Sequence, residues 1–306
     1  MRPPYGYKVR SASEDDLDAI DRMFRSYDVW ELGRSDPSRD QLLDDFRTPG
    51  FDPALNTWYV TDAYDALAAF ALYKDSEPGE EGSQGFGRVH PEHHGRGLGA
   101  FLVDSVEARW LGSDGPRGDL RHWLNAGDRS AASLLGSRGY RLIRREFHLE
   151  RPLTGLPAVA VPPGIEVRPL RDNEERTLHR LNDEAFAEHW GFMPAPFEGW
   201  REMFAAPLDA GLVWVADEAG EPVGELVLLL QGDRGWVEVL GVLPGHRGRG
   251  IGRALLRTGF AELARHGCRK AMLGVDGGNE SGALRLYESE GMTVRREWHV
   301  VEKRLG

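Results

Sequence analysis

The sequence predicts an α/β protein built from two copies of one domain, each a mixed β-sheet flanked by helices. Along the chain, segments in which apolar and polar residues alternate, as in strands, are followed by segments in which apolar residues recur with the period of a helix. A glycine-rich segment also occurs twice, because residues 89–100, VHPEHHGRGLGA, align without gaps on residues 242–253, VLPGHRGRGIGR. A repeat half a chain apart is most simply explained by a duplicated domain.

The first copy begins with a strand and a helix whose N-cap is expected at Ser13, in the run SEDDL. A hairpin follows, and then the glycine-rich segment separates a strand from a helix. We expect strands over 6–11, 57–62, 66–74, 84–90, 118–124 and 140–149, and helices over 13–27, 38–47, 97–111 and 128–138.

The second copy repeats this order. We expect strands over 165–170, 211–217, 222–231, 235–242, 269–275 and 292–303, and helices over 172–188, 196–205, 250–266 and 280–290. The segment 151–164, RPLTGLPAVAVPPG, is too rich in proline and glycine to be helical. We therefore place an N-terminal domain at 1–152, a linker at 153–164 and a C-terminal domain at 165–306.

Composition excludes several classes of function. The 306 residues are 41% hydrophobic and 28% charged, as in globular proteins, and the net charge of −11 argues against nucleic-acid or anionic-membrane binding. No apolar run approaches 18 residues and the N-terminus lacks a signal-type segment, so we expect a cytoplasmic protein. The single cysteine, Cys268, excludes an internal disulfide. Nearly all basic residues are arginine, which is typical of high-GC bacteria such as actinomycetes.

The repeated segment has the features of a site for a phosphate group. In the second copy it joins an expected strand to an expected helix, where free backbone N–H groups and the helix dipole favour an anion. Glycines at 248, 250 and 252 allow close approach, and Arg247, Arg249 and Arg253 add charge at the rim. Neither a Walker loop nor a dinucleotide fingerprint fits, since no Gly-Lys-Ser/Thr is present and residue 253 is not glycine.

Two motifs of the second copy carry a family resemblance. The pattern Arg247-x-x-Gly250-x-Gly252 and the later segment 279–291, NESGALRLYESEG, resemble the GNAT (Gcn5-related N-acetyltransferase) superfamily. The resemblance implies two tandem domains in which acyl-CoA lies between splayed fourth and fifth strands. It implies acetyl-CoA as acyl donor and the following cofactor-binding residues: Leu240, Gly241, Val242, Arg247, Gly248, Arg249, Gly250, Ile251, Gly252, Arg253, Asn279 and Tyr287.

Two residues are the catalytic candidates. Glu238 lies in an otherwise apolar strand and could accept the proton of an attacking amine, or it could simply face solvent. Tyr287 stands at the position of the family's tyrosine, which implies a donor to the departing thiolate. The thioester oxygen needs a backbone N–H near Gly241 or Val242, and Gly241 would suit a bulge that turns such a group outward.

A tandem branch of the superfamily, the mycothiol synthases, is similar in VLGVxP before the loop and LYES after it. The resemblance implies a catalytic carboxylate in that branch where this chain has Trp236. Alternation would place Trp236 and Glu238 on one face, so that Glu238 could partly substitute. Our main interpretation is therefore an uncharacterised tandem relative of these enzymes. Acetylation of a cysteinyl-glucosaminyl-inositol is the alternative function.

The acceptor amine is expected beside the segment 182–200, NDEAFAEHWGFMPAPFEGW, which mixes acids, a histidine and aromatics. Its alternative interpretation is an amphipathic helix end with core aromatics. The candidate substrate-binding residues are Asp183, Glu184, His189, Trp190 and Trp236.

The first copy has lost the two most specific residues, since His94 replaces Arg247 and Leu135 replaces Tyr287. It keeps a candidate second CoA site, formed by Val89, His94, Gly95, Arg96, Gly97, Leu98 and Gly99. This half could bind CoA without catalysis or be purely structural. The histidines 90, 93, 94 and 122 fit no standard zinc spacing, and no metal is expected.

We therefore expect an acetyl-CoA-dependent N-acetyltransferase that acts on the primary amine of a small molecule in the C-terminal half. Mycothiol synthesis and non-catalytic acyl-CoA binding are the alternatives. The expected partner is the amine substrate, without nucleic acid or membrane, and the sequence does not distinguish a monomer from a homodimer.

Overall fold

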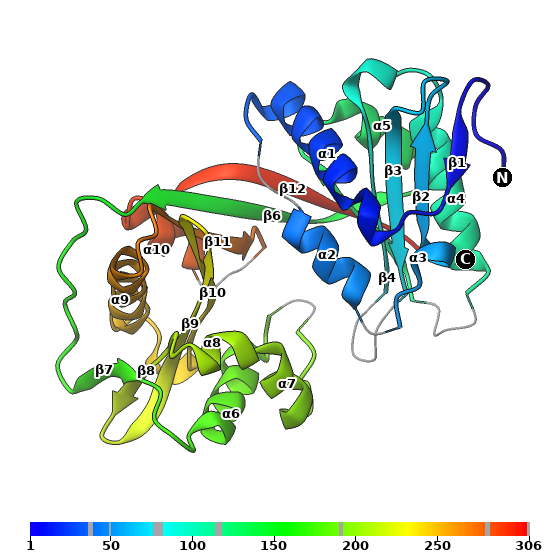
Figure 1. The fold of residues 1–306 in the computed structure, drawn as a ribbon. Coiled ribbons are helices and arrows are strands. Elements are labelled where there is room, and N and C mark those ends of the chain that lie inside the picture. The colour runs from blue at the N-terminus through cyan, green and yellow to red at the C-terminus, as the bar shows by residue number, and fades with distance from the viewer. Residues whose placement is uncertain are drawn as a thin grey trace. The chain divides into compact units, whose positions relative to one another are not determined.

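The computed structural model describes residues 1–35, 39–48, 50–75, 82–113, 118–189, 192–278 and 282–304. The chain forms two compact units (Figure 1). The first comprises Met1–Arg144 and Trp298–Gly306, and the second comprises Arg145–Glu297. Each unit is a mixed sheet between two layers of helices, as the sequence predicts.

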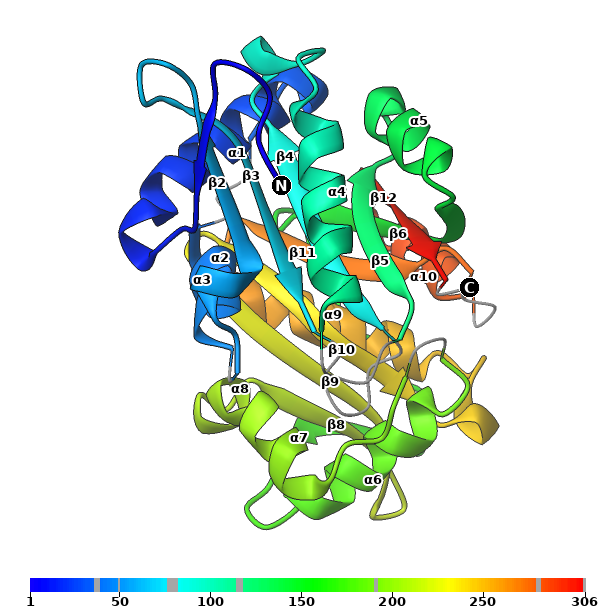
Figure 2. The same cartoon turned by 90° about the vertical axis from the view of Figure 1, so that its right-hand side faces the viewer.

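The first unit has strands in the order β1-β2-β3-β4-β5-β12. Helices α1 and α2 pack on one face of this sheet and helices α4 and α5 on the other (Figure 2). Its elements are β1 (Lys8–Arg10), α1 (Leu17–Leu32), α2 (Arg39–Arg47), α3 (Pro53–Asn56), β2 (Thr57–Thr61), β3 (Leu67–Lys74), β4 (Ser83–Val89), α4 (Leu98–Leu111), β5 (Leu120–Asn125) and α5 (Arg129–Ser137), completed by β12 (Thr293–Lys303).

The second unit repeats this arrangement with strands in the order β6-β11-β10-β9-β8-β7. Helices α6, α7 and α8 cover one face and helices α9 and α10 the other. Its elements are β6 (Arg141–Pro152), β7 (Ile165–Pro169), α6 (Glu175–Phe186), α7 (Phe197–Met203), α8 (Ala205–Asp209), β8 (Val213–Glu218), β9 (Glu221–Gln231), β10 (Arg234–Val242), α9 (Ile251–Arg265), β11 (Lys270–Asp276) and α10 (Ala283–Ser289).

The two copies exchange their last strands. Strand β6 belongs to the first copy by sequence, but its residues Glu146–Pro152 pair with β11 of the second unit. Strand β12 ends the second copy, but its residues Trp298–Lys303 pair with β5 of the first unit. The units therefore differ from the expected domains of 1–152 and 165–306, and the expected linker 153–164 is the connection from β6 to β7 inside the second unit.

The fourth and fifth strands of each unit are splayed. Strand β10 pairs in parallel with β11 only from Arg234 to Trp236, although β10 continues to Val242. In the first unit, β4 pairs with β5 only from Ser83 to Gly85. Both sheets thus have an unpaired edge of the fourth strand that leads to the glycine-rich loop.

Glycines do not prevent the fourth strand of the first unit from forming, because they make room for neighbouring groups. A Cβ at Gly85 would lie 2.3 Å from the Cε1 of buried His122 on β5. A Cβ at Gly87 would lie 3.0 Å from the Cβ of Ala71 on β3. These glycines therefore permit close approach between strands.

No helix in the part of the chain that the structure describes is long and apolar enough to cross a membrane.

Candidate active site

Strand β10 carries a bulge at Glu238. Val237 pairs with Leu228 on β9, and the next paired residue, Val239, lies opposite Val227, so Glu238 is the extra residue. Its side chain is exposed, yet desolvation by the surrounding protein raises the pKa of its carboxyl group. A carboxylate with a raised pKa accepts a proton more readily near neutral pH.

The bulge changes the face of the sheet on which the following side chains lie. Val237 packs with the core beneath α9, whereas Val239 packs with the core beneath α6. The change of face falls between Val237 and Val239, so regular alternation no longer holds for the residues that follow Glu238. The Trp236 ring lies edge-on to the His148 ring, with their centroids 5.5 Å apart.

Beyond the bulge, the backbone N–H and C=O groups of every second residue of β10 point toward the opening between β10 and β11. The N–H of Leu243 donates to the carbonyl of Val223 on β9, 3.0 Å away. Since backbone groups alternate in direction along a strand, Gly241 also points toward β9, whereas Leu240 and Val242 point toward the unpaired edge. Of the two expected donors to the thioester oxygen, only Val242 has the required direction, and the bulge expected at Gly241 lies at Glu238 instead.

Gly241 is needed because a buried acid lies against it. The Glu225 side chain on β9 is 0% exposed, and a Cβ at Gly241 would lie 2.9 Å from its Oε1 atom. The Asn182 side chain of α6 donates to the same Oε1 atom over 3.0 Å. Burial, with a smaller contribution from nearby Asp183, raises the pKa of Glu225 to about 8. The sequence analysis missed this residue, although a lone acid in the apolar run PVGELVLLL was the available signal.

Stability should depend on the Glu225 carboxyl in a defined pH range. Because its folded pKa of about 8 exceeds the ordinary value of 4.5, the folded state binds the extra proton and stability falls as pH rises from about 4.5 to about 8. We expect Glu225→Gln to remove this slope and to be more stable than the wild type by about 4 kcal/mol at pH 8. Urea unfolding at pH 5, 6.5 and 8 measures the effect, and parallel curves for the two proteins would contradict it.

The loop after β10 has the shape of an anion cradle. Gly248 and Gly250 have φ of 75° and 86°, which only glycine adopts without strain, and Gly250 is the N-cap of α9. The first N–H groups of α9 are therefore free of intrahelical partners. Gly252 lies within the helix, where a Cβ would meet the Cδ2 of Leu286 at 3.5 Å, an ordinary contact. The fold of the loop therefore does not require a glycine at position 252.

All three loop arginines have partners within the protein. Arg247 donates from Nε to the Val242 carbonyl over 3.1 Å and from Nη2 to the Ala185 carbonyl over 2.9 Å, which ties the loop to the end of α6. Arg249 forms a two-point ion pair with Glu218 at 2.5 and 2.9 Å. Arg253 pairs with Glu290 at 2.9 Å. The backbone N–H groups, rather than free guanidinium groups, are thus the main anion-binding feature.

Tyr287 lies on α10 in the core shared with α9. Its side chain is 7% exposed, and burial raises its pKa to about 12. The phenol is therefore protonated at neutral pH and can donate a proton. Glu290, on the next turn, accepts from both Arg253 and Arg257 of α9, which fixes α10 against the helix that follows the loop.

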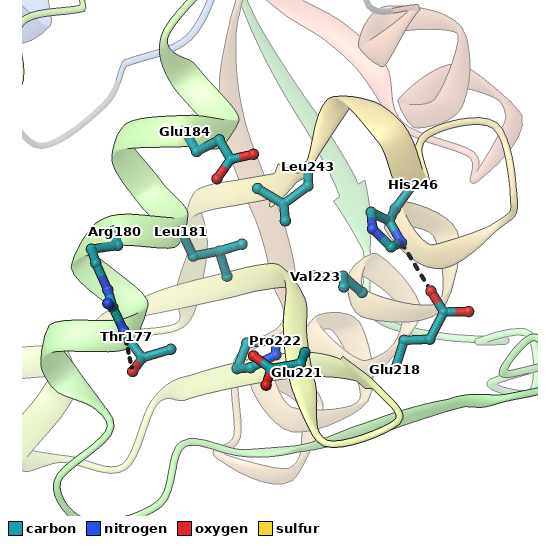
Figure 3. A pocket seen from close by; sticks show the side chains of 10 residues that line it. All are labelled: Thr177, Arg180, Leu181, Glu184, Glu218, Glu221, Pro222, Val223, Leu243 and His246. Carbon is teal, nitrogen blue, oxygen red and sulfur yellow. Dashed lines mark hydrogen bonds and ion pairs between the residues drawn. The ribbon is translucent and has the colours of Figure 1, made fainter.

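The expected acceptor residues are not all gathered in one place. Asp183 lies 3.6 Å from His179 on the same helix, and His189 packs against Phe186. Glu184 lines a groove of about 330 Å³ between α6, the turn from β8 to β9 and the segment before the loop, where His246 pairs with Glu218 (Figure 3). Trp190 and Asn279 lie outside the described residues.

The first unit keeps the loop but not the reactive side chains. Gly95 and Gly97 have φ of 74° and 79°, and Gly97 is the N-cap of α4. His94 replaces one contact of Arg247, since its Nε2 lies 3.0 Å from the Val89 carbonyl. Leu135, in the place of Tyr287, is a buried core residue. The described residues contain no group of three or more metal-ligating side chains that could hold a metal ion.

Comparison with known proteins identifies the family. Residues 176–292 match the model of the acetyltransferase (GNAT) family. A mycothiol acetyltransferase of Thermomonospora curvata is 33% identical over 75% of this chain and 76% of its own length, and one of Thermobispora bispora is 35% identical over 75% and 77%. The chain belongs to the GNAT family of acetyltransferases. It is thus an acetyltransferase, and it has actinobacterial relatives.

Solved structures support the tandem arrangement of GNAT domains. A GCN5-related N-acetyltransferase from Sphaerobacter thermophilus superposes with a TM-score of 0.88 at 28% identity, covering 99% of this chain and 98% of that one. A tandem GNAT protein from the clavulanic acid biosynthesis pathway superposes with a TM-score of 0.73 at 15% identity, covering 98% and 99%. The second likeness concerns the fold alone.

Proposed function

We propose that this GNAT protein transfers the acetyl group of acetyl-CoA to the primary amine of a small molecule, and that the second unit performs the reaction. The observation that carries the proposal is that the second unit combines a glycine-shaped loop, the bulged Glu238 with a raised pKa and the protonated Tyr287. In the first unit, Leu135 stands in the place of Tyr287 and His94 in the place of Arg247.

Each group has one task in this scheme. The backbone N–H groups of Gly248 to Arg253 hold the pyrophosphate, and the unpaired edge at Leu240 and Val242 holds the thioester arm. Glu238 accepts a proton from the ammonium or from the attacking nitrogen, directly or through water. The Val242 N–H donates to the oxygen of the tetrahedral intermediate. Tyr287 donates a proton to the departing thiolate, which leaves as CoA.

The finer alternative is acetylation of a cysteinyl-glucosaminyl-inositol. It is favoured by relatives named mycothiol acetyltransferase that are about a third identical to this chain over three quarters of their length. The residue at position 236 counts against this alternative. The sequence resemblance implied a carboxylate there, but this chain has Trp236, and its carboxylate lies in the bulge at Glu238.

A comparison of acceptors tests the proposal. The purified protein is incubated with acetyl-CoA and either the cysteinyl-glucosaminyl-inositol or a panel of other primary amines, and released CoA is measured with a thiol reagent. We expect CoA release with at least one amine. Release with the inositol conjugate alone would establish the mycothiol alternative. Binding of CoA without turnover on any acceptor would favour the non-catalytic alternative and contradict the proposal.

A further inference from the structure

A hydrogen-bonded bridge of four side chains closes the splay of the first unit. The Tyr27 hydroxyl of α1 donates to Asp128 over 2.5 Å, and the Asn125 amide donates to Glu31 of α1 over 2.5 Å. Three of these side chains are almost fully buried, with exposures of 6% for Tyr27, 3% for Asn125 and 8% for Asp128. We call Tyr27, Glu31, Asn125 and Asp128 the bridge.

The bridge spans the unpaired edges of two strands. Helix α1 packs against β3 and β4, whereas Asn125 ends β5 and Asp128 is the N-cap of the next helix, α5. Strands β4 and β5 pair only at their first three residues, so a connection from α1 to the end of β5 crosses the opening beyond them. In a GNAT domain, this opening is where the resemblance places the thioester arm of acyl-CoA.

The second unit has a small residue in the place of Tyr27. The ion pairs Arg10–Asp16 and Arg168–Glu174 align the starts of α1 and α6, and this alignment matches Tyr27 with Ala185. Asp128 is the N-cap of α5, whereas the N-cap of α10 is Gly282, which has no side chain that could form a hydrogen bond. Where the first unit has the Tyr27 phenol in hydrogen-bond contact with Asp128, the second has the methyl group of Ala185.

Neighbouring contacts hold the bridge in place. Asp128 also accepts from the Ser130 hydroxyl and the Ala131 N–H, at 2.7 and 2.8 Å. The Trp30 ring of α1 lies edge-on to the His94 ring at a centroid distance of 4.7 Å, beside the loop. Entry of an acyl-CoA arm would have to separate Tyr27 from Asp128 and Asn125 from Glu31, which would leave buried polar groups without these partners.

We propose that the bridge excludes acyl-CoA from the first unit, so that the chain binds one acyl-CoA, at the loop of the second unit. The candidate second CoA site at 89–99 keeps the shape of an anion loop, but the bridge crosses the splay beside it. This inference rests on the proposed function of the second unit.

Hydrogen–deuterium exchange of the full chain with saturating acetyl-CoA tests it. We expect exchange at 247–254 to slow at least tenfold and exchange at 94–101 to change less than twofold. Slowing at 94–101 in the wild type would overturn the inference and leave the proposed function intact. No slowing at 247–254 would contradict the proposed function, and the inference with it.

A variant that opens the bridge gives a second test. Tyr27→Ala combined with Asp128→Gly removes both side chains of the Tyr27–Asp128 hydrogen bond, and unchanged exchange in the core of α4 verifies that the variant folds. We expect acetyl-CoA to slow exchange at 94–101 at least threefold in this variant. A folded variant without such slowing would show that the bridge is not the cause of exclusion.

Discussion

Replacement of Tyr287 by phenylalanine is expected to lower kcat for acetyl transfer about 100-fold, the usual scale for loss of a general acid. The phenol is protonated at neutral pH because burial raises its pKa to about 12. Phenylalanine keeps the ring that packs in the core beneath α9 and α10, so the fold should be preserved. Steady-state kinetics and CoA calorimetry together measure the effect.

A tyrosine of the first unit provides the matched control. Tyr140 is equally buried, and Tyr140→Phe should leave kcat unchanged. The dissociation constant of CoA should be the same in Tyr287→Phe as in the wild type, since the proton is needed only as the thiolate leaves. Equal kcat in Tyr287→Phe and the wild type would contradict the assigned role.

The change of Glu238 to glutamine should lower kcat/KM for the amine about 100-fold. In the wild type, activity should fall on the acidic side as the carboxylate is protonated, at a pH above its ordinary pKa because desolvation raises that pKa. Glutamine has the same size but takes no proton, so this acidic limb should disappear from the pH profile of kcat/KM.

Glu166 on β7 is an exposed acid of the same sheet, and Glu166→Gln is the control for a general loss of negative charge. It should reproduce the wild-type profile. If Glu238→Gln retained both the wild-type rate and the acidic limb, the base would lie elsewhere, and Asp183 and His189 would be the next residues to replace.

Local patterns predict most of the fold. The expected strand over 235–242 is β10 at Arg234–Val242, and the expected helix over 250–266 is α9 at Ile251–Arg265. Both were predictable because each has a clear apolar period and glycines next to its ends. The short helices α3 and α8 were not predicted, since each has a turn or so and no period of its own. The duplication predicts the two GNAT domains, and the solved structures support them.

The exchange of β6 and β12 could not be predicted from local patterns. Each strand follows directly on its own copy, and only long-range pairing decides which sheet receives it. The bulge at Glu238 was hidden for a related reason. In the run Val237-Glu-Val239 both valines are buried, as a regular strand would have them, and only their different cores reveal the change of face.

The central claim is that the loop of the second unit, and not that of the first, binds the acetyl donor. Gly250 and Gly97 form a matched pair, because each is a helix N-cap with a positive φ and each would place a Cβ near a proline, at 3.5 and 3.6 Å. Alanine at either position introduces the same backbone strain, about 1 kcal/mol.

The KM for acetyl-CoA in the two variants is the most direct measurement. We predict that Gly250→Ala raises this KM at least about tenfold, because strain in the cradle misplaces the N–H groups that hold the pyrophosphate, an effect of about 1.4 kcal/mol or more. Gly97→Ala should leave it within about twofold of the wild type. A larger rise in Gly97→Ala than in Gly250→Ala would contradict the claim.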